Sequence, residues 1–441
     1  MGQPSDDGRE RCIVIHPNVQ GMASSSRTSA SHLEECVGLA LAIDLNVVAS
    51  DVLNVTRPKP ATLLGGGAVE RVMDQAEHDE YGIDVIIVDA ALTPIQQRNL
   101  ERAWERKVID RTGLILEIFG ARARTKEGRL QVELAAQTYQ RSRLVRSWTH
   151  LERQRGGAGF MGGPGETQIE TDRRLIDQRI TRLKRDLKDV TRTRSLHREA
   201  RRKVPYPIVA LVGYTNAGKS TLFNRLTNSD VEARDQLFAT LDPTMRGLDL
   251  PSGRSVILSD TVGFVSNLPH ELVNAFHATL EEVMEADLII HVRDCAHPDT
   301  EAQRKDVLQV LDELGVWESD DGLLPEEAGH SPMIEALNKS DQLDAVQFDV
   351  VGKQISRSDS PMFLVSAITG EGCEALLAAI DQSITAGYVT LKISLKPEDG
   401  AALAWLYEHG EVIERSDSDN SIELSVRMDS ANVDRFQRKL Y

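Results

Sequence analysis

Residues 213–220 combine glycines, a lysine and a serine in an order that suits phosphate chemistry. They read Gly213-Tyr214-Thr215-Asn216-Ala217-Gly218-Lys219-Ser220. Gly213 and Gly218 tolerate backbone conformations that are closed to other residues, so successive N–H groups can turn toward a phosphate chain. Lys219 supplies a positive charge to the outer phosphates, and Ser220 offers a hydroxyl to Mg²⁺. The segment therefore predicts a nucleoside triphosphate site that uses Mg²⁺.

The neighbours of this segment fit a nucleotide-binding turn. An apolar run of strand type, residues 208–212, precedes it, and residues 221–226 continue as a helix whose positive dipole end faces the phosphates. A glycine-rich turn without a ligand is the alternative, but it does not require strand, loop and helix in this order. The order favours a phosphate loop at one edge of a mostly parallel sheet in an α/β domain.

A second motif selects the base. The string Asn338-Lys339-Ser340-Asp341 follows the partly apolar run 333–337, about 120 residues after the phosphate loop. The Asp341 carboxylate can accept from both N1–H and the exocyclic amine of guanine, whereas adenine has no donor at N1. An unpaired carboxylate would cost roughly 1 to 3 kcal/mol, so the motif predicts GTP rather than ATP. We expect the backbone of Ser366, Ala367 and Ile368, after a further strand at 362–364, to lie near the guanine O6.

A third segment is placed to sense the γ-phosphate. Asp260-Thr261-Val262-Gly263 follows the strand expected at 255–258. We expect Asp260 to hold Mg²⁺ through water and the Gly263 N–H to meet the γ-phosphate, releasing it after hydrolysis. An ordinary strand-to-turn Asp-Thr is the alternative.

The first switch is expected between the phosphate loop and Asp260. The candidate residues are Phe238, Ala239, Thr240, Leu241 and Asp242. Thr240 is the candidate for a second hydroxyl on Mg²⁺, and Thr244 is its competitor. The string is a weak signal when taken alone.

Phe264 follows Gly263, where Ras-like enzymes carry a glutamine that positions the attacking water. A benzyl group cannot orient water, so we expect slow intrinsic hydrolysis and a missing group supplied by a partner, an ordered switch or an extra cation. Asn216 suggests K⁺ as that cation, because an asparagine at this position coordinates K⁺ in several GTPases that lack the glutamine. A purely loop-shaping Asn216 is the alternative. The predicted catalytic residues are thus Lys219, Thr240, Gly263 and Asn216.

Composition places the chain among cytoplasmic, multidomain proteins. Its 441 residues are 41% hydrophobic, enough for two or three cores. The four cysteines lie far apart without metal-ligand spacing, which argues against a disulfide framework. No apolar run approaches ~18 residues, and the first twenty lack the order of a signal peptide. We expect a soluble monomer without a transmembrane segment; peripheral membrane association stays open.

Charge is segregated along the chain. The net charge is −17, yet residues 111–203 carry 23 Lys and Arg against 11 Asp and Glu. The flanking parts, 1–110 and 204–441, are both acidic. Such segregation indicates partners better than the total does, and it points to an anionic partner for the middle segment.

The basic segment reads as two helices. Residues 168–203 contain no glycine, and apolar residues repeat along them at coiled-coil spacing: Ile169, Ile176, Ile180, Leu183, Leu187 and Val190. The preceding stretch offers an apolar partner, which predicts an antiparallel hairpin over 126–203. Arginines and lysines from Arg173 to Arg198 cover the outer face. A solvated helix face is the alternative, but we favour contact with a phosphate backbone because acidic residues do not balance this charge.

The loop of this hairpin, residues 156–165, is rich in glycine and carries Phe160 and Met161. A flexible basic tip with an exposed aromatic ring suits insertion into folded RNA, where Phe160 could stack on a base. A second nucleotide site is the rival interpretation, which is weaker because no strand precedes these glycines and no Lys-Ser follows them.

Two further domains flank these parts. Strand-like and helical stretches alternate over 11–125 and predict a small α/β subdomain with a parallel sheet, after a disordered tail at 1–10. The GTPase domain is expected over 206–388. Residues 389–441 predict a small α+β domain of unknown role.

With these residues laid out, the chain resembles the HflX family of ribosome-associated GTPases from about residue 11 to the end of the GTPase domain. The motifs that carry the resemblance are 108–112 with 115–119 and 122–125, 148–154, 163–168, 213–220 with 238–244, and 260–264. Two places depart from the family's usual pattern. Glu335 interrupts the apolar strand before Asn338, and residues 317–332 form an acidic insertion. The last 50 residues match least.

The resemblance implies a ribosomal role. It implies binding to the large ribosomal subunit, with the hairpin and its loop reaching ribosomal RNA near the peptidyl transferase centre. It further implies ribosome-stimulated GTP hydrolysis, and splitting or rescue of stalled ribosomes or a part in subunit biogenesis. Carried over by residue, Ser220 and Thr240 are the Mg²⁺ ligands.

Two other functions stay open at this point. A GTP-dependent RNA-binding scaffold or assembly factor would use turnover only to reset a binding switch. An ATP-driven RNA remodelling activity in the N-terminal half would need ATP turnover that survives Lys219→Ala.

Overall fold

The structure is a computed structural model of the chain. It describes residues 8–20, 27–79, 82–154, 164–201, 206–229, 237–238, 244–266, 280, 282–316, 332–358, 360–385, 388–418, 421–429, 433 and 435–436. For helix residues 144–154, 164–169 and 191–201 only the course of the backbone is described. The expected first-switch residues 239–242, the tip residues Phe160 and Met161, the tail residues 1–7 and the insertion residues 317–331 lie outside the described residues.

The N-terminal part contains a parallel sheet of four strands in the order β2-β1-β3-β4. Its elements are β1 (Arg11–Val19), α1 (Ser29–Leu41), β2 (Asn46–Val55), α2 (Gly66–His78), β3 (Val85–Val88), α3 (Pro94–Trp104) and β4 (Lys107–Asp110). β3 is buried at every position, as expected of a central parallel strand. The expected small parallel sheet is confirmed.

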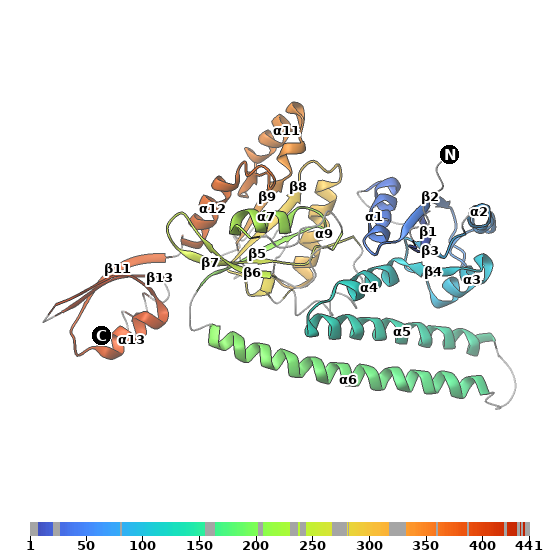
Figure 1. The fold of residues 1–441 in the computed structure, drawn as a ribbon, viewed down its shortest axis with the longest axis horizontal. Helices are drawn as coiled ribbons and strands as arrows, with labels where there is room; N and C mark the ends of the chain where they lie inside the picture. The colour runs from blue at the N-terminus through green and yellow to red at the C-terminus, as the bar shows by residue number, and fades with distance from the viewer. Residues whose placement is uncertain are drawn as a thin grey trace.

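The middle part is a helical hairpin (Figure 1). α4 (Arg111–Arg122) leads from the N-terminal sheet into α5 (Lys126–Gln154), and α6 (Pro164–Arg201) lies alongside α5. α6 begins four residues before the expected start, at Pro164, because proline suits the first turn of a helix. Two residues of the expected seam, Ile180 and Leu183, are buried.

The largest sheet has six strands in the order β10-β9-β8-β5-β7-β6, all parallel except β6. Its elements are β5 (Ile208–Gly213), α7 (Lys219–Thr227), β6 (Thr244–Asp249), β7 (Ser255–Asp260), β8 (Leu288–Asp294), α9 (Thr300–Glu313), β9 (Met333–Asn338), η1 (Ser340–Gln342), α11 (Ala345–Ile355), β10 (Met362–Leu364) and α12 (Cys373–Thr385). The sequence did not predict β6, because a half-exposed edge strand with an internal glycine gives little alternation of apolar residues. Parallel order brings the ends of β5, β7, β8, β9 and β10 to one edge of the sheet.

One hydrophobic core joins the N-terminal part to the part that contains the six-stranded sheet, residues 208–385. Cys36 of α1 and Phe119 of α4 share a buried cluster with Phe238, Phe264 and Val265. The rings of Phe119 and Phe238 meet edge to face, with centroids 4.6 Å apart. These two parts of the chain therefore share one buried core.

The C-terminal part is an α+β unit at the far end of the molecule from the N-terminal sheet (Figure 1). Its antiparallel sheet has the order β11-β13-β12, made by β11 (Tyr388–Leu395), β12 (Glu411–Asp417) and β13 (Ile422–Asp429). α13 (Gly400–His409) packs Leu406 into the core of this sheet. Among the described helices, none is both long and apolar enough to span a bilayer.

Candidate nucleotide site and basic hairpin

The loop between β5 and α7 has glycines at the two positions where a side chain could not fit. Gly213 has φ +154° and Gly218 has φ +88°. A Cβ at Gly213 would lie 2.2 Å from the carbonyl oxygen of Val292, and one at Gly218 would lie 2.2 Å from Nδ2 of Asn338. The loop therefore needs both glycines, as its sequence pattern predicts.

Lys219 opens α7 with its amino group enclosed by the loop. Nζ donates to the carbonyl oxygens of Tyr214 at 2.8 Å and Gly213 at 3.1 Å. Burial lowers the pKa of Lys219 to about 8, an effect that the charge of Asp260 offsets in part. A buried ammonium group held by carbonyls is a favourable partner for an anion, so the loop fits a phosphate chain.

Two hard oxygen donors meet beside Lys219. The Ser220 hydroxyl donates to Oδ2 of Asp260 at 2.7 Å, and Asp260 is fully buried at the end of β7. A hydroxyl and a carboxylate next to a phosphate site form the donor set that Mg²⁺ prefers. The structure thus brings together two of the three expected metal residues; the third, Thr240, lies outside the described residues.

The segment after Asp260 pairs with the start of the phosphate loop. Thr215 N–H donates to the carbonyl of Phe264 at 2.8 Å, and Phe264 N–H donates to the carbonyl of Gly213 at 3.1 Å. Gly263 is therefore held against the loop, where a Cβ would lie 2.8 Å from Thr215 Cα and 3.0 Å from Lys219 Nζ. The Phe264 ring lies in the shared core, and the residue is 2% exposed.

The base-reading motif lies at the end of β9 as expected. Lys339 has φ +66° and pairs with Asp294 at 2.8 Å. The carboxylate of Asp341 is exposed and accepts from the Ser366 hydroxyl at 2.5 Å, which turns it toward the loop that carries Ala367. Ile368 is 65% exposed.

Asn338 joins the two halves of the candidate site. Its Nδ2 donates to the carbonyl of Ala217 at 2.8 Å, and its Oδ1 accepts from Ala367 N–H at 3.0 Å. It therefore ties the phosphate loop to the loop after β10. The sequence places Asn338 in the nucleotide-binding motif, and its contacts in this structure are with protein backbone.

Glu335 does not disturb the strand that contains it. β9 pairs with β8 in unbroken register, from Ile289 with Met333 to Asp294 with Asn338. Glu335 is 1% exposed and accepts from Arg293 at 2.6 Å and from Arg304 at 2.8 Å. Two guanidinium partners allow a carboxylate to replace an apolar residue in this strand.

Asn216 is exposed at the tip of the phosphate loop with φ +60°. Asparagine tolerates this left-handed conformation better than most residues do. The geometry is thus compatible both with a loop-shaping role and with an outward-facing oxygen for a cation.

One loop residue has a role that its sequence position does not indicate. Tyr214 is 4% exposed, and its hydroxyl contacts Arg27 and Glu35 of the N-terminal part. The only available signal was a large aromatic residue inside a loop that otherwise has small side chains. Nothing in the sequence indicated which distant residues it would meet.

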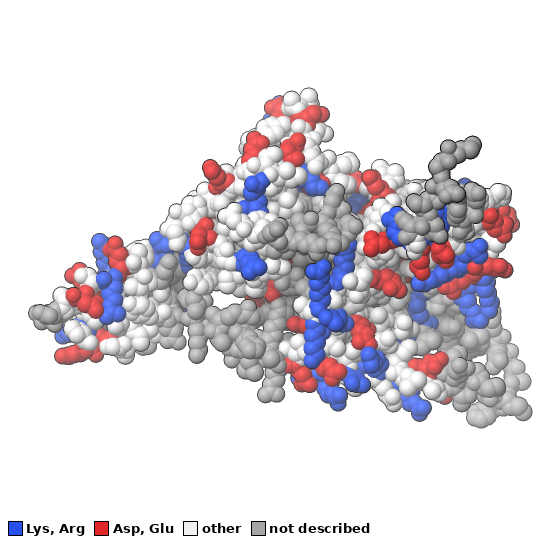
Figure 2. Space-filling model, viewed as in Figure 1, with Lys and Arg blue, Asp and Glu red and all other residues white. Residues whose placement is uncertain are grey.

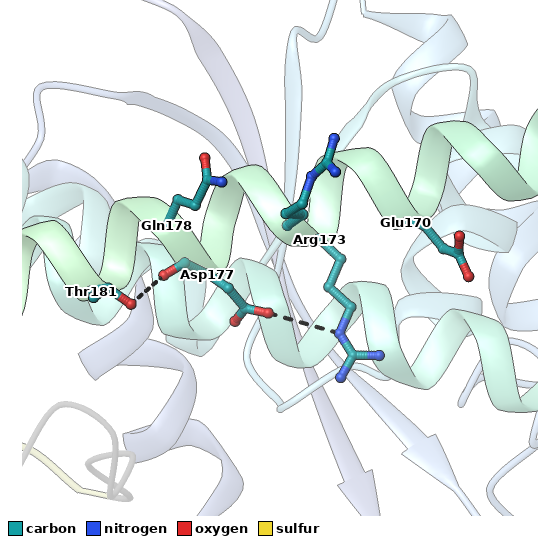
Figure 3. A pocket seen from close by; sticks show the side chains of 6 residues that line it. Glu170, Arg173, Asp177, Gln178 and Thr181 are labelled. Atoms are coloured by element: carbon teal, nitrogen blue, oxygen red, sulfur yellow. Dashed lines mark hydrogen bonds and ion pairs between the residues drawn. The ribbon is translucent and has the colours of Figure 1, made fainter.

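In the described part of α6 the Arg and Lys side chains are exposed and are mixed with carboxylates (Figure 2). On α6, Arg173 lies within 4.0 Å of Asp177 and Arg182 within 3.7 Å of Asp186, whereas exposed Lys184 has no ion pair within the described part of the chain. Figure 3 shows a shallow pocket on this helix, lined by Glu170, Arg173, Arg174, Asp177, Gln178 and Thr181. Carboxylates thus lie beside part of the basic face of α6.

The parallel sheet, the phosphate loop and the guanine motif together define a GTPase of the phosphate-loop class. Comparisons with known proteins extend this conclusion to the family. Family models match in chain order: "GTP-binding GTPase N-terminal" at 30–120, "GTP-binding GTPase Middle Region" at 122–201, "50S ribosome-binding GTPase" at 208–324 and "HflX C-terminal domain" at 351–441. The chain belongs to the HflX family of GTPases, and it binds and hydrolyses GTP.

Relatives align along nearly the whole chain. A protein of Magnetococcus marinus named GTPase HflX is 49% identical over 405 residues, which cover 92% of this chain and 90% of the relative. The protein of the same name from Escherichia coli K12 is 42% identical over 426 residues, covering 96% and 94%. The resemblance, expected from the sequence only as far as the end of the GTPase domain, also covers the C-terminal part, because the C-terminal model matches residues 351–441.

A solved structure is also similar. It is described as a GTP-binding protein from the archaeon Sulfolobus solfataricus in complex with GDP. It is 21% identical to this chain, with a TM-score of 0.43, and the match covers 85% of this chain and 99% of that one.

Proposed function

We propose that this GTPase acts on the ribosome. It binds the large ribosomal subunit, hydrolyses GTP there, and splits or rescues stalled ribosomes or takes part in subunit biogenesis; such a role places it in the cytoplasm. The observation that carries the proposal is the combination, in one chain, of a GTP site and a basic helical hairpin packed on the same fold. The description of one matching family model as a 50S ribosome-binding GTPase supports it.

We propose specific roles for the residues of the nucleotide site. The loop from Gly213 to Ser220 holds the phosphates, and the Lys219 ammonium group contacts the outer ones. Asp341 reads the guanine edge, with backbone from Ser366 to Ile368 near O6. Gly263 N–H senses the γ-phosphate. The enclosed position of Lys219 and the orientation of Asp341 by Ser366 support these roles.

Mg²⁺ would be held by Ser220 and Thr240, with Asp260 acting through water. Bound there, it would neutralise charge that develops on the phosphates during transfer. The chain's own residues orient the nucleotide and exclude water: the Lys219 amino group is covered by the loop carbonyls, and Phe264 closes the core side of the site.

The hairpin is the proposed RNA-binding element. Lys184 and Lys188 project from α6 as exposed cations, and Arg182 and Arg185 are exposed beside Asp186. Exposed cations along a rigid helix contact a phosphate backbone by releasing its counterions, which makes the binding depend on salt. The Gly-rich tip would then enter a crevice of folded ribosomal RNA.

The second candidate is a GTP-dependent RNA-binding scaffold or assembly factor that does not split ribosomes. The same hairpin favours it, because phosphate contacts alone do not reveal whether the subunits separate after binding. Light scattering of intact ribosomes mixed with the protein and GTP distinguishes the two candidates. A splitting factor lowers the scattered intensity, and a Lys219→Ala variant does not. Unchanged scattering with retained GTP-dependent binding would support the scaffold.

A further inference from the structure

The hydroxyl of Tyr214 lies where three parts of the chain meet. It accepts from the backbone N–H of Ser266 at 2.6 Å and from Nη1 of Arg27 at 2.9 Å, and it donates to the carboxylate of Glu35. A tyrosine hydroxyl has one proton to donate and two lone pairs, so all its hydrogen-bonding capacity is used. The phosphate loop, the segment after Gly263 and the N-terminal part are thus joined at one atom.

Glu35 of α1 forms hydrogen bonds with both Tyr214 and Ser266; this group of three side chains is called the junction below. One oxygen accepts from Tyr214, and the other accepts from the Ser266 hydroxyl at 2.7 Å. Arg111 also holds Ser266 in place, because its Nη2 donates to the Ser266 carbonyl at 3.1 Å and to the Ser266 hydroxyl at 2.9 Å. The Glu35 and Arg111 side chains are 9% and 7% exposed, so these bonds are shielded from water.

Glu35 remains a strong acceptor in this buried place. Burial by itself would raise the pKa of its carboxyl group, but the Arg111 guanidinium and the hydrogen bonds from Tyr214 and Ser266 hold the pKa below its ordinary value. The group is therefore ionised near neutral pH, and charge-assisted hydrogen bonds of this kind are the stronger ones.

The junction restrains the segment that is expected to respond to the γ-phosphate. Ser266 lies three residues after Gly263, and Phe264 between them is paired with the phosphate loop. Gly263 lies beside Thr215 and Lys219, so near that an added Cβ would come within 2.8 Å of Thr215 Cα and 3.0 Å of Lys219 Nζ. A γ-phosphate has to reach that amino group, so the position in which Gly263 is held bears on how well GTP fits. GDP, which ends at the β-phosphate inside the loop, places no phosphate there.

We propose that Glu35 is a positioning residue that sets the preference of the site between GDP and GTP. Through Tyr214 and Ser266 it holds the second switch, the segment from Asp260 to Ser266, over Lys219, so that binding of a γ-phosphate has to break or rearrange this junction. The same contacts then report the nucleotide state to the N-terminal part, which continues through α4 into the hairpin. The inference rests on the proposed nucleotide roles.

Two variants test this role of Glu35 while leaving most other contacts in place. Glu35→Gln keeps the shape of the side chain, and each arginine keeps a carboxylate partner, since Arg111 binds Asp89 at 2.6 Å and Arg27 binds Asp306 at 2.7 Å. Tyr214→Phe removes the hydroxyl alone. The matched control is Ser31→Ala, which removes a hydrogen bond from α1 to Asp299 that touches neither the phosphate loop nor the second switch.

The measurement is the dissociation constant of the full-length protein for GDP and for a non-hydrolysable GTP analogue, by isothermal titration calorimetry. We expect Glu35→Gln and Tyr214→Phe each to shift the ratio of the two constants toward the GTP analogue by roughly fivefold to tenfold, the size of one lost buried hydrogen bond. The double variant should shift it no further than the larger single effect, because both act through one junction. Ser31→Ala should leave the ratio unchanged.

Three results would overturn the inference while leaving the nucleotide site intact. They are equal losses for both nucleotides, an equal shift in Ser31→Ala, and a double variant whose effects simply multiply. If the wild-type protein bound neither nucleotide, the proposed nucleotide site and this inference would both be wrong.

Discussion

The side-chain amide of Asn338 lies directly over Gly218, so close that a methyl group on the glycine would come within 2.2 Å of Nδ2. The same amide donates to the carbonyl of Ala217, the residue before that glycine. The base-reading motif and the phosphate loop are therefore locked in one relative position. A guanine nucleotide would bind to a site whose two ends are already spaced for it.

Gly218→Ala should abolish tight nucleotide binding. The new methyl group would collide with Asn338, and φ of +88° is strained for alanine, so the loop must change shape. We expect affinity for GDP to fall by at least about 100-fold, because the distorted loop would lose its charge-assisted hydrogen bonds to the phosphates. The matched control is Gly247→Ala on β6, where a Cβ meets open space. Equal affinity in both variants, measured by calorimetry, would contradict the loop geometry.

Asp341→Asn should change the base that is bound. The amide can no longer accept from both N1–H and the exocyclic amine of guanine, so GTP affinity should fall by roughly 10- to 100-fold. Xanthine carries an oxygen in place of that amine, and the amide N–H can donate to it. Competition between GTP and xanthosine triphosphate measures the change. An unchanged preference for GTP would show that Asp341 does not read the base.

GDP affinity should depend on pH through Lys219. Burial lowers its pKa to about 8 in the free protein, from an ordinary value of 10.5. Below that pH the amino group is charged and affinity is flat; above it the group loses its proton, and affinity should fall by at most about tenfold per pH unit. Over the same range the nucleotide-free protein gains stability, because the unfolded chain still binds the proton.

The control for this pH dependence is Lys219→Met, which has no proton to lose. Its weaker GDP affinity should show no fall that begins near pH 8, and its stability should lack the rise between about pH 8 and 10.5. If the wild-type and Met profiles were parallel, the titrating group would lie elsewhere.

Intrinsic GTP hydrolysis should be faster in KCl than in NaCl at equal ionic strength if Asn216 helps to hold a cation. Asn216→Gly separates the two roles of this residue, because glycine adopts φ of +60° freely but offers no side-chain oxygen. We expect this variant to keep nucleotide affinity and lose the difference between the two salts. A wild-type rate that is the same in both salts would leave Asn216 as a loop-shaping residue.

Local patterns predicted the parts of the site that depend on neighbouring residues. The strand-loop-helix order around Lys219, the strand before Asp260 and the strand before Asn338 each follow from apolar runs and turn residues, and parallel order then places their ends at one edge. The helical hairpin followed from a seven-residue repeat. Ser220 meets Asp260 because both lie at such strand ends.

The contacts that were missed join residues far apart in the chain. Glu35 meets Tyr214 across 179 positions, and Ser266 across 231. No periodicity in either segment encodes that meeting, because it depends on how the N-terminal part packs on the phosphate-loop part. Glu335 is a similar case: its charge looks like a break in a strand until Arg293 and Arg304 are seen beside it. Long-range polar pairing of this kind is visible only in the folded chain.

We propose that the large ribosomal subunit activates this GTPase through the hairpin. Single-turnover GTP hydrolysis, measured with and without purified large subunits at fixed salt, tests it most directly. We predict an acceleration on the order of 10³ or more, comparable to that of other partner-supplied catalytic groups. A Lys184→Ala/Lys188→Ala variant should keep the intrinsic rate and need more subunit to reach the accelerated one. A rate that large subunits leave unchanged would contradict the account.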